Sequence, residues 1–488
     1  MEVTMHWLDS AWRNRSIIIG FTRVEYPHSG VRLAEHFIET VKAMDGALLG
    51  SIWCVTTNND SNNEAMVEVL NLRLPEEMAT YELTAAPSSA SEMDLGDETP
   101  RSSSPKVLQL RCMAHVLQLE VREGLKKCPL VDTDIGTIRD ILKKMADSPK
   151  LMEALGNVCD VLQVKFTAPA LDCATRWNST MAMVMSAIKL MKPIEELLRR
   201  IRDRHDGYTD FTISPDHRLA SNIPPSTWLA LKAICSFLMP IKAATTMMSG
   251  KNYPTFGMTL VVYHLASKHA AKAASSSTPG HTRAFARAFK SKLDQYASAV
   301  KTREAMIAAA LDPRAKAMLS QMVDDVEALK LSIIDEYEAE YKSVFEGQQD
   351  DASTPARSQA EEEDVNEGNK LHQLMDEHFS VNAPTSPQSE QFSGELDRWM
   401  AQSGMDMRSS SRDVCKWIEV NGALFPRIQM MARDFLGVTA TSVPSEEAFS
   451  AAGATVSVRR ARLGDDTVSA ISELQSFLQF NDATLRDR

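Results

Sequence analysis

Residues 425–480 read FPRIQMMARDFLGVTATSVPSEEAFSAAGATVSVRRARLGDDTVSAISELQSFLQF. Apolar residues recur at helical spacing at both ends of this stretch, and one β-leaning interruption, FLGVTATSV at 435–443, lies between them. The acidic residues Glu446 and Glu447 follow Pro444, a composition that helix N-termini favour. An apolar stripe on the last helix, expected to be buried, consists of Leu463, Val468, Ile471, Leu474 and Leu478, with Phe477 beside it.

The first 84 residues show the pattern of a small α/β unit. Alternating and β-branched residues predict strands near 3–9 and 15–25, paired as a hairpin. Helical spacing follows from residue 31 to 44, then the apolar run SIWCVTT at 51–57, then a helix from 63 to 70. The predicted order is therefore strand, strand, helix, strand, helix.

The rest of the chain is predicted to be mostly helical, with two interruptions. Residues 85–105 are rich in Ser, Pro and acids and predict a disordered insertion, and 106–344 predict a helical insertion domain. Residues 345–390 predict an acidic linker, because Glu346–Asn369 holds eight acids and one base. Residues 391–488 form the predicted C-terminal region, so the fold class is α/β plus mostly α.

Composition narrows the function classes. The 488 residues contain 53 Lys and Arg against 65 Asp and Glu, a net charge of −12, which is unlike a stand-alone nucleic-acid binder. No window reaches the ~18 uninterrupted apolar residues of a membrane span, and no secretory signal is expected at the start. Seven scattered cysteines favour reduced thiols inside the cell.

Several phrases together are similar to the hAT superfamily of DNA transposases and their domesticated relatives. Residues 425–480 resemble the family's C-terminal dimerisation region along their whole length, and ELDRWM at 395–400 belongs to the same pattern. The resemblance implies that the apolar stripe and Phe477 are dimerisation residues, buried partly against a second subunit. The other phrases follow the family's order: MHWLD (5–9), PHSG (27–30), VTTNNDSNN (55–63), RCMAHVLQLEVREGL (111–125), DCATRWNST (172–180), YPT (253–255) and LDPRAK (311–316).

The resemblance implies an RNase H-like mixed sheet interrupted by a long helical insertion. Such cores use three carboxylates to hold two divalent cations for DNA cleavage and strand transfer. The family's first catalytic Asp lies on a strand before MHWLD, a point that precedes Met1; Asn58 stands in place of the second, and Glu446 matches the third. We therefore expect a catalytically incomplete remnant with no cofactor. Polar turn residues at 58–63 and a helix cap at Glu446 explain the same residues without any metal.

Other candidate residues carry two interpretations each. Cys112 and His115 share a helix face, which suggests either half a zinc site or a packed histidine; the resemblance adds a role on the active-site side of the insertion. Arg176 and Trp177 match an Arg-Trp pair that faces DNA in the family. The alternative interpretation is that Trp177 packs in the core at the start of a helix. Basic runs considered for phosphate contacts are Arg199, Arg200, Arg202 and Arg204, and Arg459, Arg460 and Arg462.

Three function classes follow. The first is a transposase-derived, catalytically incomplete protein that forms a homodimer and contacts DNA or chromatin in the nucleus, without a membrane or a small-molecule substrate. The second is an active transposase that needs Mg²⁺ or Mn²⁺, and Asn58 opposes it because a neutral amide binds such ions weakly. The third is a helical interaction scaffold.

Overall fold

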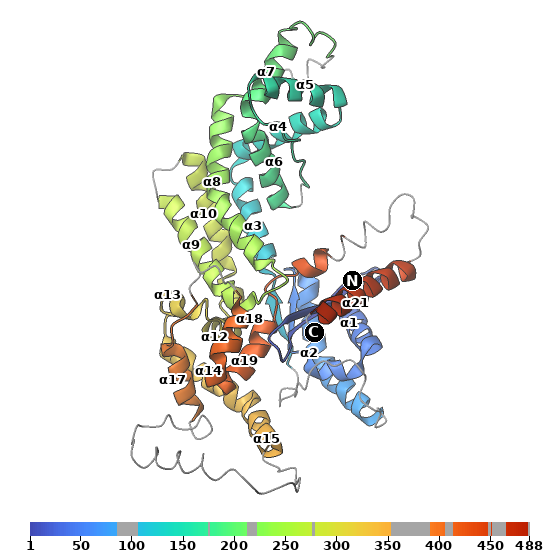
Figure 1. Ribbon diagram of the computed structural model, residues 1–488, viewed down its shortest axis with the longest axis vertical. Helices are drawn as coiled ribbons and strands as arrows, with labels where there is room; N and C mark the ends of the chain where they lie inside the picture. The colour runs from blue at the N-terminus through green and yellow to red at the C-terminus, as the bar shows by residue number, and fades with distance from the viewer. Residues whose placement is uncertain are drawn as a thin grey trace, which may run out of the picture. The chain divides into compact units, whose positions relative to one another are not determined.

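The computed structural model describes residues 1–84, 106–173, 176–211, 222–275, 279–352, 391–405, 413–447, 450 and 465–486 (Figure 1). The chain divides into two compact units. We call Met1–Leu110, Gly250–Val261 and Lys301–Arg488 the core unit, and Arg111–Ser249 with Val262–Val300 the helical unit. The predicted insertion at 85–105 and most of the predicted acidic linker lie outside the described residues.

The chain opens with the predicted hairpin. Strands β1 (Glu2–Leu8) and β2 (Asn14–Phe21) pair antiparallel, with Leu8 opposite Asn14 and Glu2 opposite Phe21. Asp9 stabilises the turn, because its Oδ1 accepts the backbone N–H groups of Ala11 at 3.0 Å and Arg13 at 2.8 Å. Alternation of side chains therefore predicted this element correctly.

Two helices and a second sheet follow. They are α1 (Gly30–Met44), η1 (Gly46–Ser51), β3 (Cys54–Thr57), α2 (Ser61–Thr84) and β4 (Leu108–Arg111). Ser29 caps α1, which buries its apolar stripe with Leu49, Leu70 and Leu74. The predicted order of these elements is confirmed. The prediction of a helix at Leu108–Arg111 is wrong, because these residues form β4, which pairs with β3. The strands of the described residues form two sheets, β1–β2 and β3–β4.

The remainder of the core unit is helical. Its elements are η3 (Phe256–Met258), α12 (Arg303–Leu311), η4 (Lys316–Met318), α13 (Leu319–Met322), α14 (Val326–Glu340), α15 (Lys342–Ala352), α17 (Phe392–Ala401), α18 (Val414–Asn421), η5 (Gly422–Leu424), α19 (Pro426–Gly437) and α21 (Asp465–Arg486). The predicted β-leaning stretch 435–443 is not a strand: its first three residues end α19, and the next ones have no regular structure.

Residues after α19 nevertheless lie beside β3. The Thr56 hydroxyl donates to the Thr439 carbonyl at 2.6 Å, and the Ala440 N–H donates to the Thr255 hydroxyl at 2.9 Å. The rings of Trp53 and Phe435 lie 5.1 Å apart. Side-chain oxygens thus satisfy backbone groups that a strand would pair with a neighbouring strand, which is why β-branched residues form no ladder here.

A buried ion pair fixes the start of α19. The Glu395 carboxylate accepts the backbone N–H groups of Arg427 at 2.8 Å and Ile428 at 2.9 Å, and the Arg427 guanidinium at 2.9 Å. Glu395 is 1% exposed, and burial raises its pKa. The carboxylate satisfies N–H groups that have no partner within the helix, so ELDRWM packs directly on the C-terminal region.

The helical unit contains α3 (Met113–Lys126), α4 (Pro129–Ala146), α5 (Pro149–Val161), α6 (Trp177–Lys189), α7 (Met191–Arg202), α8 (Pro225–Met248), α9 (Thr259–Ser275, from Val262 on), α10 (Gly280–Gln295) and α11 (Ala297–Val300) (Figure 1). Helices α3 and α10 approach closely at Gly124, where an added Cβ would lie 2.6 Å from Phe285. By length and composition α8 could cross a membrane. Its Phe237 and Leu238 are buried in this unit.

Candidate functional site

The junction between β3 and α2 holds Asn58. Its side-chain oxygen accepts the Asp60 backbone N–H at 3.3 Å and the amide of Asn63. The Asp60 carboxylate in turn accepts the Asn62 N–H at 2.9 Å, at the start of α2. Asn58 and Asp60 are exposed. These contacts are those of a polar turn that starts a helix, so the amide oxygen is already used by its own loop.

Glu446 lies on a short helical turn, residues 443–447, and is exposed. Its N–H donates to the Ser442 carbonyl at 3.1 Å, and the Ser442 hydroxyl donates to its carboxylate at 3.4 Å. The neighbouring Glu447 forms an ion pair with Lys251, a residue that sequence reasoning missed. No sequence motif marks Lys251, and the two residues come together only in the folded chain.

Lys251 also influences β1. Burial and, to a smaller extent, the Lys251 charge lower the pKa of His6 to about 4. Burial raises the pKa of Glu2 to about 7, whereas the chain's amino terminus and Lys251 act in the opposite direction. A cation therefore already lies among the acidic groups of this region.

These residues do not fit a two-ion site. In the parts of the chain that the structure describes, no three His, Cys, Asp or Glu side chains are grouped to hold a metal ion. Asn58 is a neutral amide engaged in its loop, and Glu447 already has Lys251 as counter-ion. Mg²⁺ requires several oxygen ligands in near-octahedral geometry, and carboxylates are its usual protein donors.

Cys112 and His115 lie at the start of α3 in the helical unit. Cys112 is 1% exposed and His115 is half-buried. Cys128, the next thiol along the chain, donates to the His281 carbonyl at 3.3 Å, and burial raises its pKa. Both thiols are therefore packed side chains, and burial favours the protonated form of Cys128.

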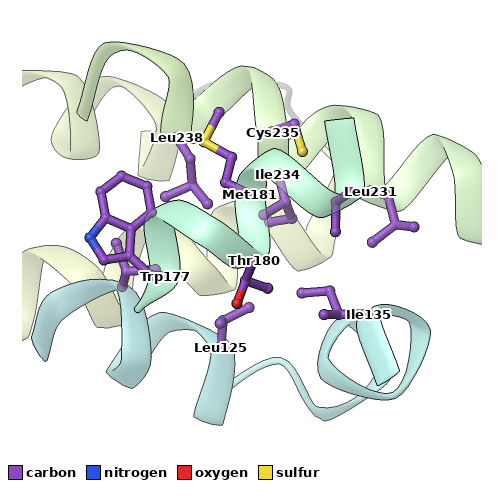
Figure 2. A pocket seen from close by; sticks show the side chains of 11 residues that line it. Leu125, Ile135, Trp177, Thr180, Met181, Leu231, Ile234, Cys235 and Leu238 are labelled. Atoms are coloured by element: carbon purple, nitrogen blue, oxygen red, sulfur yellow. The ribbon is translucent and has the colours of Figure 1, made fainter. Parts of the chain in front are cut away.

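Trp177 begins α6 and lies in the core of the helical unit. It is 5% exposed and lines a small apolar pocket with Leu125, Met181 and Leu238 (Figure 2). Its backbone N–H donates to the Gln118 side chain at 3.2 Å. In this conformation the indole packs between helices, whereas Arg176 before it is exposed.

The basic run on α7 is largely neutralised by its own helix. Arg199 and Arg200 both bind Glu196, at 2.9 and 2.7 Å, and Arg202 lies 3.3 Å from Asp203. Three guanidinium groups therefore already have carboxylate partners. The second predicted patch, Arg459, Arg460 and Arg462, lies outside the described residues, as does Leu463.

Helix α21 attaches to β2 by polar groups rather than by its predicted apolar stripe. The Ile18 N–H donates to the Ser476 hydroxyl at 2.9 Å, and the Phe21 N–H to the Glu473 carboxylate at 3.3 Å. Phe480 adds an aromatic contact, with its ring 5.9 Å from that of Trp7. The attached face is thus Glu473, Ser476 and Phe480.

A second face of α21, which carries part of the predicted stripe, is exposed within one chain. Leu474 is 58%, Leu478 54% and Phe477 41% exposed. Ile471 is half-buried, and the Val468 side chain is outside the described set. By contrast, Trp399 and Phe435 in the same C-terminal region are fully buried in the core unit. We call Leu474, Phe477 and Leu478 the α21 apolar face.

Comparison with known families matches three parts of the chain. Residues 1–82 match the ZBED1 RNase-like domain, 110–223 the ZBED1 RNase-like helical domain, and 395–478 the hAT family C-terminal dimerisation region. The chain belongs to the hAT superfamily. This hAT protein therefore has an RNase-like part and a dimerisation region, in agreement with the resemblance seen in its phrases.

Curated relatives of this hAT protein are similar over almost its whole length. A Zea mays protein described as an AC transposase is 24% identical over 96% of this chain and 54% of its own length. The zinc finger BED domain-containing protein RICESLEEPER 2 of Oryza sativa subsp. japonica is 23% identical over 98% of this chain and 62% of its own length. The chain thus spans about half to three fifths of these relatives.

Proposed function

We propose that this hAT protein is catalytically incomplete and acts by self-association through its C-terminal region. The observation that carries the proposal is the α21 apolar face. It lies inside the matched dimerisation region, and three large side chains on it are 41–58% exposed. Grouped exposed side chains of this size are typical of contact surfaces between proteins.

The attachment of α21 supports this assignment. Its polar side is held by β2 backbone groups, so rotating the helix to bury Leu474 would break both hydrogen bonds. The apolar face is therefore presented outward on an anchored helix. A second copy of the chain can cover it by packing the same face in a symmetric, isologous contact.

The experiment is a double substitution, Leu474→Glu and Phe477→Glu, with light scattering as the readout. Facing charges across a two-fold contact repel, so the variant should have the mass of one chain, 54.1 kDa, and the parent about twice that. The matched control is Leu130→Glu with Leu229→Glu, at positions that are 81% and 67% exposed in the helical unit. If the charged α21 variant stayed dimeric, the α21 apolar face would not be the dimer contact.

Catalytic incompleteness rests on the Asn58 junction. A neutral amide that accepts two hydrogen bonds within its own loop supplies no charge for a divalent cation. A two-ion mechanism needs both ions, because one activates the attacking oxygen and the other stabilises the leaving oxygen. Glu446 alone cannot replace such a ligand set, so we expect no metal-dependent DNA cleavage.

We further propose that the two sheets belong to one RNase H-like core. The end of α19 and the segment after it support this, since they lie beside both sheets: the Thr439 carbonyl accepts the Thr56 hydroxyl of β3, and a Cβ at Gly437 would lie 3.3 Å from the Leu8 nitrogen of β1. DNA or chromatin binding, and residence in the nucleus, complete the proposal. The likeness to an AC transposase supports these last points.

A further inference from the structure

The charge of the chain is divided very unequally between its two units. The helical unit contains 25 Lys and Arg against 16 Asp and Glu, a net of +9, whereas the whole chain carries 53 against 65. The net charge of −12 therefore hides a basic unit within an acidic chain. Three of its helices, α8, α9 and α10, hold eight of these bases and a single acid, Asp294.

Four bases of α9 and α10 are exposed, whereas Lys290 and Lys292 of α10 are half-buried. Both helices pack on Phe237 of α8, whose ring lies 4.8 Å from that of His269 on α9 and 5.4 Å from that of Phe285 on α10. Lys268 and Lys272 on α9, and Arg283 and Arg287 on α10, are exposed. We call these four residues the basic face.

The basic face differs from the other bases of the unit in its ion pairs. Among the described residues, no ion pair involves any of its four members. Lys290 on α10 differs, because Asp294 binds it at 2.7 Å. The α7 arginines differ in the same way, through Glu196 and Asp203. Four exposed cations without acidic partners are free to neutralise an external polyanion.

The spacing of these cations suits a phosphate backbone. Within each helix the two bases are four residues apart, which places them on one side of the helix with a rise of roughly 6 Å. Phosphates on one strand of a duplex advance about 3.4 Å per nucleotide, so each pair spans about two nucleotides. Nothing in this arrangement reads base edges, so the contact is independent of sequence.

We infer that the basic face binds the phosphate backbone of a nucleic acid. The inference rests on the proposed function, because it names the surface through which a self-associating hAT protein contacts DNA. The dimer would carry two such faces. Binding at both would raise the apparent affinity on a long duplex above that on a short one.

Fluorescence anisotropy with the full chain tests this, using a labelled 20-base-pair duplex of arbitrary sequence in EDTA. The parent should bind with an affinity that falls with salt, at a log–log slope of about −3 to −4 for four phosphate contacts. The triple substitution Lys272→Gln, Arg283→Gln, Arg287→Gln should reduce that slope by about 2 to 3 and weaken binding ten- to a hundredfold at 0.1 M salt.

The matched control is Arg199→Gln, Arg200→Gln, Arg202→Gln on α7, which removes the same charge from the same unit and should bind nearly as the parent does. If both triple variants lost the same affinity for DNA, binding would reflect the overall positive charge of the unit, and the proposal of a local surface would be wrong. A parent that binds polyglutamate but not DNA would overturn nucleic acid as the partner. Light scattering on the same samples reports the dimer separately, so failure of this inference and failure of self-association are distinguishable.

Discussion

Glu120→Gln should stabilise the helical unit, because Glu120 is a buried acid with no hydrogen-bond partner in the described part of the chain. It lies on α3 and is 0% exposed, and neither carboxylate oxygen accepts a hydrogen bond from another described residue. One turn later Gly124 touches Phe285 of α10, so the acid points into a tightly packed helix pair. Burial raises the pKa of Glu120 to about 9, and the Lys292 charge offsets only part of this.

The sign and size of the effect follow from this pKa. The unfolded chain loses the proton near 4.5, whereas the folded chain keeps it up to about 9. Between these values the folded state binds one more proton, so its stability falls as pH rises, by about 1.4 kcal/mol per pH unit. At pH 7.5 this amounts to at most about 4 kcal/mol, and relaxation of the site reduces it to roughly 2–4 kcal/mol.

Urea unfolding of the full chain, followed by far-ultraviolet circular dichroism at pH 6.0, 7.5 and 8.5, measures this difference. Glu120→Gln keeps the shape of the neutral acid and should remove the pH-dependent loss. Glu123→Gln, on the same helix and beside Lys126 at 4.0 Å, is the matched control and should leave the pH dependence unchanged. If the Glu120→Gln variant kept the pH dependence of the parent, the interpretation of Glu120 as a buried, neutral acid would be wrong.

Three further substitutions test the packing. Glu395→Ala should destabilise the core unit by about 3–5 kcal/mol in urea unfolding, because it removes the buried carboxylate that pairs with the Arg427 guanidinium and accepts two N–H groups of α19; Asp397→Ala, on the same helix but 65% exposed, should cost far less. Gly124→Val should cost about 1–3 kcal/mol by overpacking against Phe285, whereas Gly156→Ala, which meets no atom within 4 Å, should be neutral or stabilising. Burial lowers the pKa of Lys316 from 10.5 to about 8, so stability should rise between these pH values in the parent and not in Lys316→Met.

Local sequence patterns correctly predicted the elements that show in the spacing of their own apolar residues. The hairpin and α1 follow from alternation and from a helical stripe that the structure buries. Strand β4 was missed because four residues, Leu108–Arg111, directly precede a long helix and carry no turn signal. Its partner β3 is about 50 residues away in the sequence, and the spacing of residues within one segment does not predict pairing with so distant a strand.

The candidate site was harder to predict for the same reason. Apolar spacing does not tell which side of α21 contacts its own chain: β2 backbone N–H groups donate to Glu473 and Ser476, which leaves Leu474 and Leu478 exposed. Lys251 reaches Glu447 only because distant segments fold together. Whole-chain charge argued against a nucleic-acid contact, since averaging hid the helical unit's +9. Asn58, by contrast, could be assessed directly from the residue type.

Cleavage of supercoiled duplex DNA by the purified chain in Mg²⁺ or Mn²⁺ distinguishes an incomplete catalytic site from an active one. We expect no nicking above that of Glu446→Gln, because the Asn58 junction and one exposed glutamate cannot hold two ions. Metal-dependent nicking by the parent that disappears in Glu446→Gln would contradict this expectation and would establish this hAT protein as an active nuclease.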